Sequence, residues 1–209
     1  MSIQSMRPEL SEADIVRLMK GETSEERATV AHRLCRRIAV DMLSDEERIY
    51  ADEIIGILAE DTAELVRRTL AVTLQNSPRL PHKVALQLAQ DVETVAIPVL
   101  ESSPVFTDDD LIELVLAVTS AKQAAIAARA TISGPLAEVI CEHGSETAVE
   151  TVAANSGAEF SDKAYDDSIT RFPANARGDR AARSRPGSYC REDGFTCLRT
   201  GFRPADQPS

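Results

Sequence analysis

The segment Leu58-Ala59-Glu60-Asp61 recurs thirty positions later as Leu88-Ala89-Gln90-Asp91. A second segment, Leu74-Gln75-Asn76-Ser77-Pro78, recurs twenty-six positions later as Leu100-Glu101-Ser102-Ser103-Pro104, and residues 153–157 are a weaker third copy. Self-similarity with a period of about 20–50 residues is typical of repeat proteins, in which one unit cannot bury its own apolar face and must stack on its neighbours. The two segments therefore predict a solenoid.

Each repeat unit reads as two helices joined by a turn that contains Pro or Gly. Pro78 and Pro104 end the first helix of their units, because the residue before a proline disfavours helical dihedrals. Asp61 and Asp91 stand where a carboxylate can cap the helix that follows. We expect second helices over residues 81–89, 107–118, 133–143 and 161–171, and short apolar helices over 124–128 and 148–153.

Longer amphipathic helices are expected before the repeats. Ser11 precedes a helix over 12–20, and the capping boxes Thr23-Ser24-Glu25-Glu26 and Ser44-Asp45-Glu46-Glu47 open helices that run to about residues 43 and 60. No alternating run bounded by turns predicts a strand. The expected fold is all-α: an N-terminal helical bundle, residues 1–60, that continues into a short α-solenoid over residues 61–172.

The unit L-A-x-D, followed by V-R-R-x-L-A (66–71) and S-P-x-L-P (77–81), resembles HEAT-like and leucine-rich-variant repeats of bacterial proteins. Residues 9–172 are similar to an uncharacterised bacterial family of HEAT-like proteins, a domain of unknown function. The resemblance implies a HEAT-like α-solenoid and brings no catalytic residues. Leucine-rich-variant proteins can carry an N-terminal iron–sulfur cluster that needs several Cys. Only Cys35 lies in the first half of this chain, so no cofactor is expected.

The charge of the 209-residue chain is unevenly distributed. The net charge is −11, but residues 176–209 hold seven Arg and four acidic residues, which leaves −14 for the remainder. Leu198 is the only Leu, Ile or Val of that segment, so we expect a disordered tail over 173–209, either native or the product of a shifted reading frame. An uncapped apolar end near Ile169 and Phe172 would then favour self-association.

The sequence also indicates the cellular compartment of the protein. No apolar run approaches the roughly 20 residues that span a bilayer, and the first ten residues lack the apolar core of a signal peptide. The four Cys are not spaced as a disulfide framework. We therefore expect a cytoplasmic protein with no membrane partner.

The sequence offers few candidate catalytic or metal-binding residues. Cys141-Glu142-His143 is the one Cys/His neighbourhood, but a zinc site needs four ligands, so a semi-buried Cys and a His near a helix C-terminus is the better interpretation. Asp108-Asp109-Asp110 lacks the Gly and distal Glu of a calcium loop and fits an acidic helix start. No phosphate loop, nucleophile elbow or zinc-protease motif is present. We expect neither catalysis nor a bound metal.

One cluster of basic residues is a candidate partner-binding site, and it consists of His32, Arg33, Arg36, Arg37, Arg67 and Arg68. The cluster could contact an acidic partner, or it could be a solvated face paired with nearby acids such as Asp41 and Glu25. Arg67 is expected to pair with Asp91 of the neighbouring repeat.

The expected function is that of a non-catalytic, regulatory scaffold or adaptor that binds another macromolecule, a protein partner, on its helical-repeat surface. Two alternatives remain open: a HEAT-like nucleic-acid-binding or glycosylase-like protein, which the acidic body disfavours, and an oligomerisation module.

Overall fold

The computed structural model describes residues 12–40 and 43–172. These residues form eleven helices and no strand, which confirms the all-α prediction. The helices are α1 (Glu12–Met19), α2 (Ser24–Val40), α3 (Asp45–Ala59), α4 (Glu64–Leu74), α5 (His82–Gln90), α6 (Glu93–Ser102), α7 (Asp108–Ala117), α8 (Ser120–Ala127), α9 (Gly134–His143), α10 (Glu146–Ala154) and α11 (Asp162–Arg171). None of these helices is long and apolar enough to cross a membrane.

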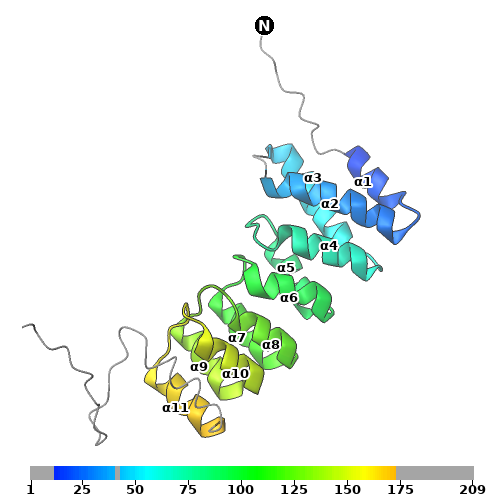
Figure 1. Ribbon diagram of the computed structural model, residues 1–209. Coiled ribbons are helices and arrows are strands. Elements are labelled where there is room, and N and C mark those ends of the chain that lie inside the picture. Colours follow the sequence, from blue (N-terminus) through cyan, green and yellow to red (C-terminus); the bar gives the residue numbers. More distant parts are fainter. Residues whose placement is uncertain (1–11, 41–42, 173–209) are drawn as a thin grey trace, which may run out of the picture.

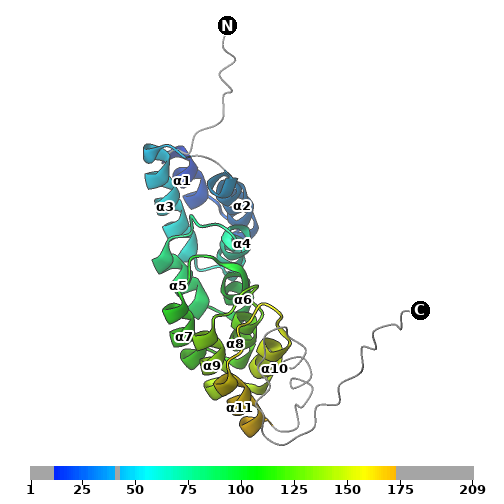
Figure 2. The same cartoon turned by 90° about the vertical axis from the view of Figure 1, so that its left-hand side faces the viewer.

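The helices stack in two layers, which Figure 2 shows side by side. The even layer consists of α2, α4, α6, α8 and α10, each packed against the next. The odd layer holds the odd-numbered helices, in which α3 packs on α5, α7 on α9 and α9 on α11. The result is an elongated, solenoid-like stack with α1 and α11 at opposite ends (Figure 1).

Buried aliphatic side chains between the layers hold the stack together. Leu70, Leu74, Val95 and Leu100 are all fully buried, as the repeat pattern predicts. They belong to one continuous cluster that extends from Ile15 in α1 to Ala164 in α11. Apolar burial of this extent is the main favourable term that offsets the conformational entropy of the ordered helices.

The recurring Ser-Pro segments close equivalent turns after α4 and α6. The buried Ser77 hydroxyl accepts the Arg79 N–H at 3.3 Å, and the buried Ser103 hydroxyl accepts the Val105 N–H at 3.4 Å. In the weaker copy after α10, the Asn155 side chain accepts the Gly157 N–H at 2.9 Å. A side-chain acceptor two residues ahead of the N–H is typical of Asx and Ser/Thr turns, so the sequence repeat is a repeat of turn geometry.

The predicted capping boxes at Thr23 and Ser44 are present. Thr23 and Glu26 exchange reciprocal bonds at the start of α2, and Ser44 and Glu47 do so at the start of α3. Residues 41 and 42 and the predicted tail over 173–209 lie outside the described residues.

The prediction that Asp61 and Asp91 cap the following helices is wrong. The N-cap of α4 is Ala63 and that of α6 is Val92, neither with a side-chain cap. Asp61 accepts the Ala63 N–H and Asp91 accepts the Val92 N–H, ahead of each helix. The two carboxylates lie ahead of the helix starts because each also binds an arginine of a neighbouring helix.

Candidate partner-binding surface

The six predicted basic residues fall into three environments. The Arg67 guanidinium binds both carboxylate oxygens of Asp91, the residue that ends α5, with Nη2 3.0 Å from Oδ1. Its Nη1 donates to the backbone oxygens of Asp61 at 2.7 Å and Thr62 at 3.3 Å. Arg67 is only 18% exposed. The predicted Arg67–Asp91 pair is therefore confirmed, and the Arg67 guanidinium is already fully engaged within the stack.

Arg37 lies on the flank of α2 that faces α1. Its Nη1 is 3.6 Å from Oδ2 of Asp14, a buried residue of α1. Arg33 precedes Arg37 by one helical turn and therefore lies on the same flank, where it is exposed. These two arginines border the end of the stack.

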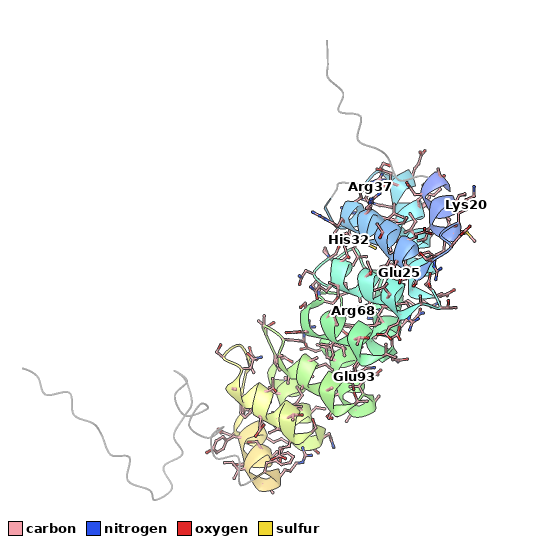
Figure 3. The ribbon with its side chains drawn as sticks, turned by 45° about the vertical axis from the view of Figure 1, so that its right-hand side comes forward. Lys20, Glu25, His32, Arg37, Arg68 and Glu93 are labelled. Carbon is pink, nitrogen blue, oxygen red and sulfur yellow. The ribbon has the colours of Figure 1, made fainter. Side chains whose placement is uncertain are left out.

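His32, Arg36 and Arg68 point outward from the even layer, and all three are exposed. His32 lies beside α4, because its Nδ1 is 3.4 Å from the Thr73 hydroxyl. Figure 3 shows His32 on α2 and Arg68 on the adjacent α4 along the same side of the stack. Among the described residues, no acidic side chain forms an ion pair with any of these three.

Two apolar side chains of α4 complete this surface. Leu65 is 43% exposed and Val72 is 46% exposed, on either side of Arg68 in the helix. The spacing of three and four residues places all three on one face of α4, opposite the buried Val66, Leu70 and Leu74. We name His32, Arg36, Leu65, Arg68 and Val72 the basic–apolar surface.

Leu65 and Val72 are the functional candidates that sequence reasoning missed. An apolar residue in an amphipathic helix is ordinarily assigned to the core. The available signal was that α4 already has a full core stripe in Val66, Leu70 and Leu74, so that Leu65 and Val72 fall outside it.

The Cys141-Glu142-His143 neighbourhood does not converge on one point. Cys141 is fully buried, and burial, together with the Asp167 charge, raises the pKa of its thiol to about 12. Glu142 and His143 face solvent, and Glu142 accepts Lys163 Nζ at 3.0 Å. The described residues contain no group of three His, Cys, Asp or Glu that could hold a metal ion.

The Asp108–Asp110 segment forms the acidic start of α7, as predicted. Thr107 is the N-cap, and Thr107 and Asp110 form a reciprocal capping box. The Asp110 carboxylate also lies 2.9 Å from Nε2 of His82 in α5. The segment therefore has a structural explanation at this helix end.

The geometry defines an all-α protein of stacked helix pairs with a basic–apolar outer surface. Residues 95–186 match the family described as "Uncharacterised protein conserved in bacteria (DUF2336)". The match covers α6 to α11 from Val95 onward and does not reach the basic–apolar surface on α2 and α4. No curated protein and no solved structure matches the chain.

Proposed function

We propose that this chain is a non-catalytic scaffold or adaptor that binds another protein on its basic–apolar surface. The observation that carries the proposal is the pairing state of the arginines. Arg67 and Arg37 are engaged by acids within the stack, whereas Arg36 and Arg68 point outward beside exposed Leu65 and Val72. Arginine is enriched at protein interfaces and among their hot spots, and a partner that covers these arginines would also remove the two exposed aliphatic side chains from water.

A nucleic-acid partner fits this surface less well. Exposed Glu25 and Glu64 lie on the same helices as the three basic side chains, and exposed Glu93 and Glu101 lie on the adjacent α6. Phosphate backbones bind through runs of basic residues that release counterions, and interspersed carboxylates oppose this. The acidic balance of the residues before the tail opposes approach at longer range as well.

Site-specific crosslinking in the native host tests the proposal. A photoreactive amino acid in place of Val72 should form an adduct with another protein, and Arg36→Glu with Arg68→Glu should abolish it. The same amino acid at Lys83, exposed on α5 of the odd layer, serves as the matched control and should not give that adduct. Equal adducts at both positions, or an adduct indifferent to the charge reversals, would contradict the proposal.

Two finer assignments belong to the same proposal. We infer that the helix pairs are HEAT-like repeats, since the two-layer stacking and the repeated turns after α4, α6 and α10 support that assignment. We also place the protein in the cytoplasm, which the free thiols of Cys35 and Cys141 support. Self-association remains a prediction; at the end of the stack, Ile169 is 41% exposed.

A further inference from the structure

The odd layer is interrupted between α5 and α7. In the described part of the chain, α3 packs on α5, α7 packs on α9 and α9 packs on α11, whereas α5 and α7 make no comparable contact. The consecutive helices α6 and α7 make none either, although α5 packs on α6 and α7 packs on α8. The even layer continues past this point, because α4, α6, α8 and α10 pack in succession (Figure 2). Only one of the two layers is therefore discontinuous here.

Side-chain contacts on the even side hold the two parts of the stack together. Lys122 in α8 and Arg129 just after it donate to backbone oxygens at the C-terminal ends of α5 and α6, respectively. The Thr119 hydroxyl, at the N-cap of α8, donates to the Glu93 carboxylate at the start of α6, with the two oxygens 2.9 Å apart. These contacts and the packing of α6 on α8 fix the two parts to each other on this side.

On the odd side, one pair of side chains bridges the interruption. Nε2 of His82 lies 2.9 Å from Oδ2 of Asp110. His82 is the first residue of α5, and Asp110 lies in the first turn of α7, so the pair joins the N-terminal ends of the two helices. The His82 side chain is half exposed, and exposed ion pairs contribute little to stability because water competes for both partners. Opening this contact therefore costs little free energy.

The helix at the centre of the interruption also lacks a backbone hydrogen bond. Pro98 lies inside α6, which is the one described helix with a proline in its interior. A proline has no N–H, so the Thr94 oxygen lacks the donor that an α-helix supplies four residues later. Interior prolines are common sites of helix bending. Because α6 packs on α4 and α5 on one side and on α8 on the other, this weak point lies where the two parts of the stack meet.

We propose that α6 is a hinge about which α1–α5 and α7–α11 move as two units, and that the His82–Asp110 pair is a latch that holds the odd layer closed. Opening separates the N-terminal ends of α5 and α7, while α6 and α8 stay packed. In a stack of helix pairs each unit contacts only its neighbours, so a missing neighbour contact confines the bending to one place.

This inference goes beyond the proposed function and does not depend on it. Since α4 and α8 pack on α6 from different units, movement about α6 changes the angle between them. A partner that spans both helices on the outer face of the even layer would bind one angle better than the others and would shift the population toward it.

Distances between spin labels on the full chain test the proposal. The hinge-spanning pair carries labels at Asp52→Cys in α3 and Glu113→Cys in α7. The matched pair carries them at Glu113→Cys and at Asp166→Cys in α11, so it also skips one odd helix but lies within one unit. All three positions are exposed. Cys35 and Cys141 are buried and are retained, and the other two cysteines are replaced by serine. Double electron–electron resonance measures both distance distributions.

The hinge-spanning pair should give a broader distribution than the matched pair. His82→Asp, which places a second carboxylate beside Asp110, should shift the hinge-spanning distribution to longer distances. Pro98→Ala, which restores the missing N–H donor, should narrow it. Lys83→Ala, one position along from the latch and exposed, is the control and should change neither distribution. Circular dichroism of each variant checks that its helices are retained.

Equal widths for the two pairs, or a hinge-spanning distribution that His82→Asp leaves unchanged, would overturn the proposal. A shift of the same size in the matched pair would also overturn it, since the motion would then be spread along the whole stack. A response to His82→Asp without any response to Pro98→Ala would contradict the assignment of α6 as the hinge.

Discussion

At the residue scale, two aspartates connect successive helix pairs by using both of their polar groups. The Asp61 carboxylate binds Arg27 of α2, with Nε 2.8 Å from Oδ2, while its backbone oxygen accepts Arg67 of α4. The Asp91 carboxylate binds Arg67, while its backbone oxygen accepts the buried ammonium group of Lys122 from α8. The resulting chain of contacts fixes the offset of each helix relative to the last.

Arg67→Ala should lower the free energy of unfolding by about 1–3 kcal/mol, because hydrogen bonds from a charged donor are lost and the partly buried Asp91 carboxylate is left unpaired. Arg68→Ala, one position along and exposed, is the matched control and should change stability by less than about 0.5 kcal/mol. Urea unfolding followed by circular dichroism measures both. Equal effects of the two substitutions would show that the Arg67–Asp91 contact does not support the stack.

The same contacts predict how stability depends on pH. The hydrogen bond from Arg27 lowers the pKa of Asp61, and the one from Arg67 lowers the pKa of Asp91. A carboxyl group with a lower pKa in the folded state stabilises the fold above its unfolded pKa of about 3.9, and this contribution is lost as the pH falls through the folded-state pKa.

An Asp61→Asn/Asp91→Asn variant should therefore be less stable than the wild type at pH 7. The difference between the two proteins should shrink as the pH is lowered below about 4, where the wild type loses the contribution that the variant never had. Urea midpoints measured at intervals between pH 7 and pH 3 test this. A difference that grows on acidification would contradict the assigned direction of the two pKa shifts.

At the element scale, a leucine of α6 and a leucine of α4 lie in different environments, one in the core and one at the surface. Leu100 of α6 is fully buried, whereas Leu65 of α4 is 43% exposed. Leu100→Ala should cost about 2–5 kcal/mol, because it removes buried methyl groups and leaves a cavity between stacked helices. Leu65→Ala should cost far less. Chemical denaturation of both variants checks this, and similar costs would argue against α6 as a core helix.

The turn between α10 and α11 depends on a close backbone approach. Ile132 and Ala158 form an isolated parallel bridge, with the Glu159 N–H 2.8 Å from the Ile132 oxygen. A Cβ atom on Gly157 would lie 1.9 Å from the backbone oxygen of Ala130. Only glycine fits there without displacement of that strand-like contact.

Gly157→Ala should therefore destabilise the chain by about 1–3 kcal/mol, since the backbone must shift to relieve the overlap. Gly134→Ala is the matched control, because a Cβ atom on Gly134 meets nothing within 4 Å. Alanine in this helix should be neutral or stabilising by up to about 1 kcal/mol. Thermal melts of the two variants give the comparison, and a harmless Gly157→Ala would refute the tight turn.

At the scale of the whole molecule, negative charge dominates, and the basic side chains are concentrated near one end of the stack. Fluorescence anisotropy with duplex and single-stranded oligonucleotides should show only weak, non-specific binding at physiological salt. Sub-micromolar binding that falls steeply with salt, and that Arg33→Glu, Arg36→Glu and Arg68→Glu abolish, would instead support the nucleic-acid alternative.

The sequence singled out basic residues of α2 and α4, but it could not separate them by role. Arg67 and Arg68 are neighbours of identical chemistry, and one is 18% exposed and ion-paired while the other faces solvent. Adjacent residues of a helix point about 100° apart, and the face of the helix that packs decides which of the two is buried. The exposure of Leu65 and Val72 could not be predicted from the sequence for the same reason.

The sequence by itself determined the helices and the repeat, because periodicity, capping residues and turn chemistry are local properties that recur at each unit. The expectation that such units stack on one another then predicted the pairing of Arg67 with Asp91. Only the tertiary structure decided which surface remains available. Asp61 and Asp91, which the sequence predicted as helix caps, instead form contacts between helices, because the fold brings Arg27 and Arg67 beside them. Exposure depends on what stacks against each helix, and residues distant in the chain supply those neighbours.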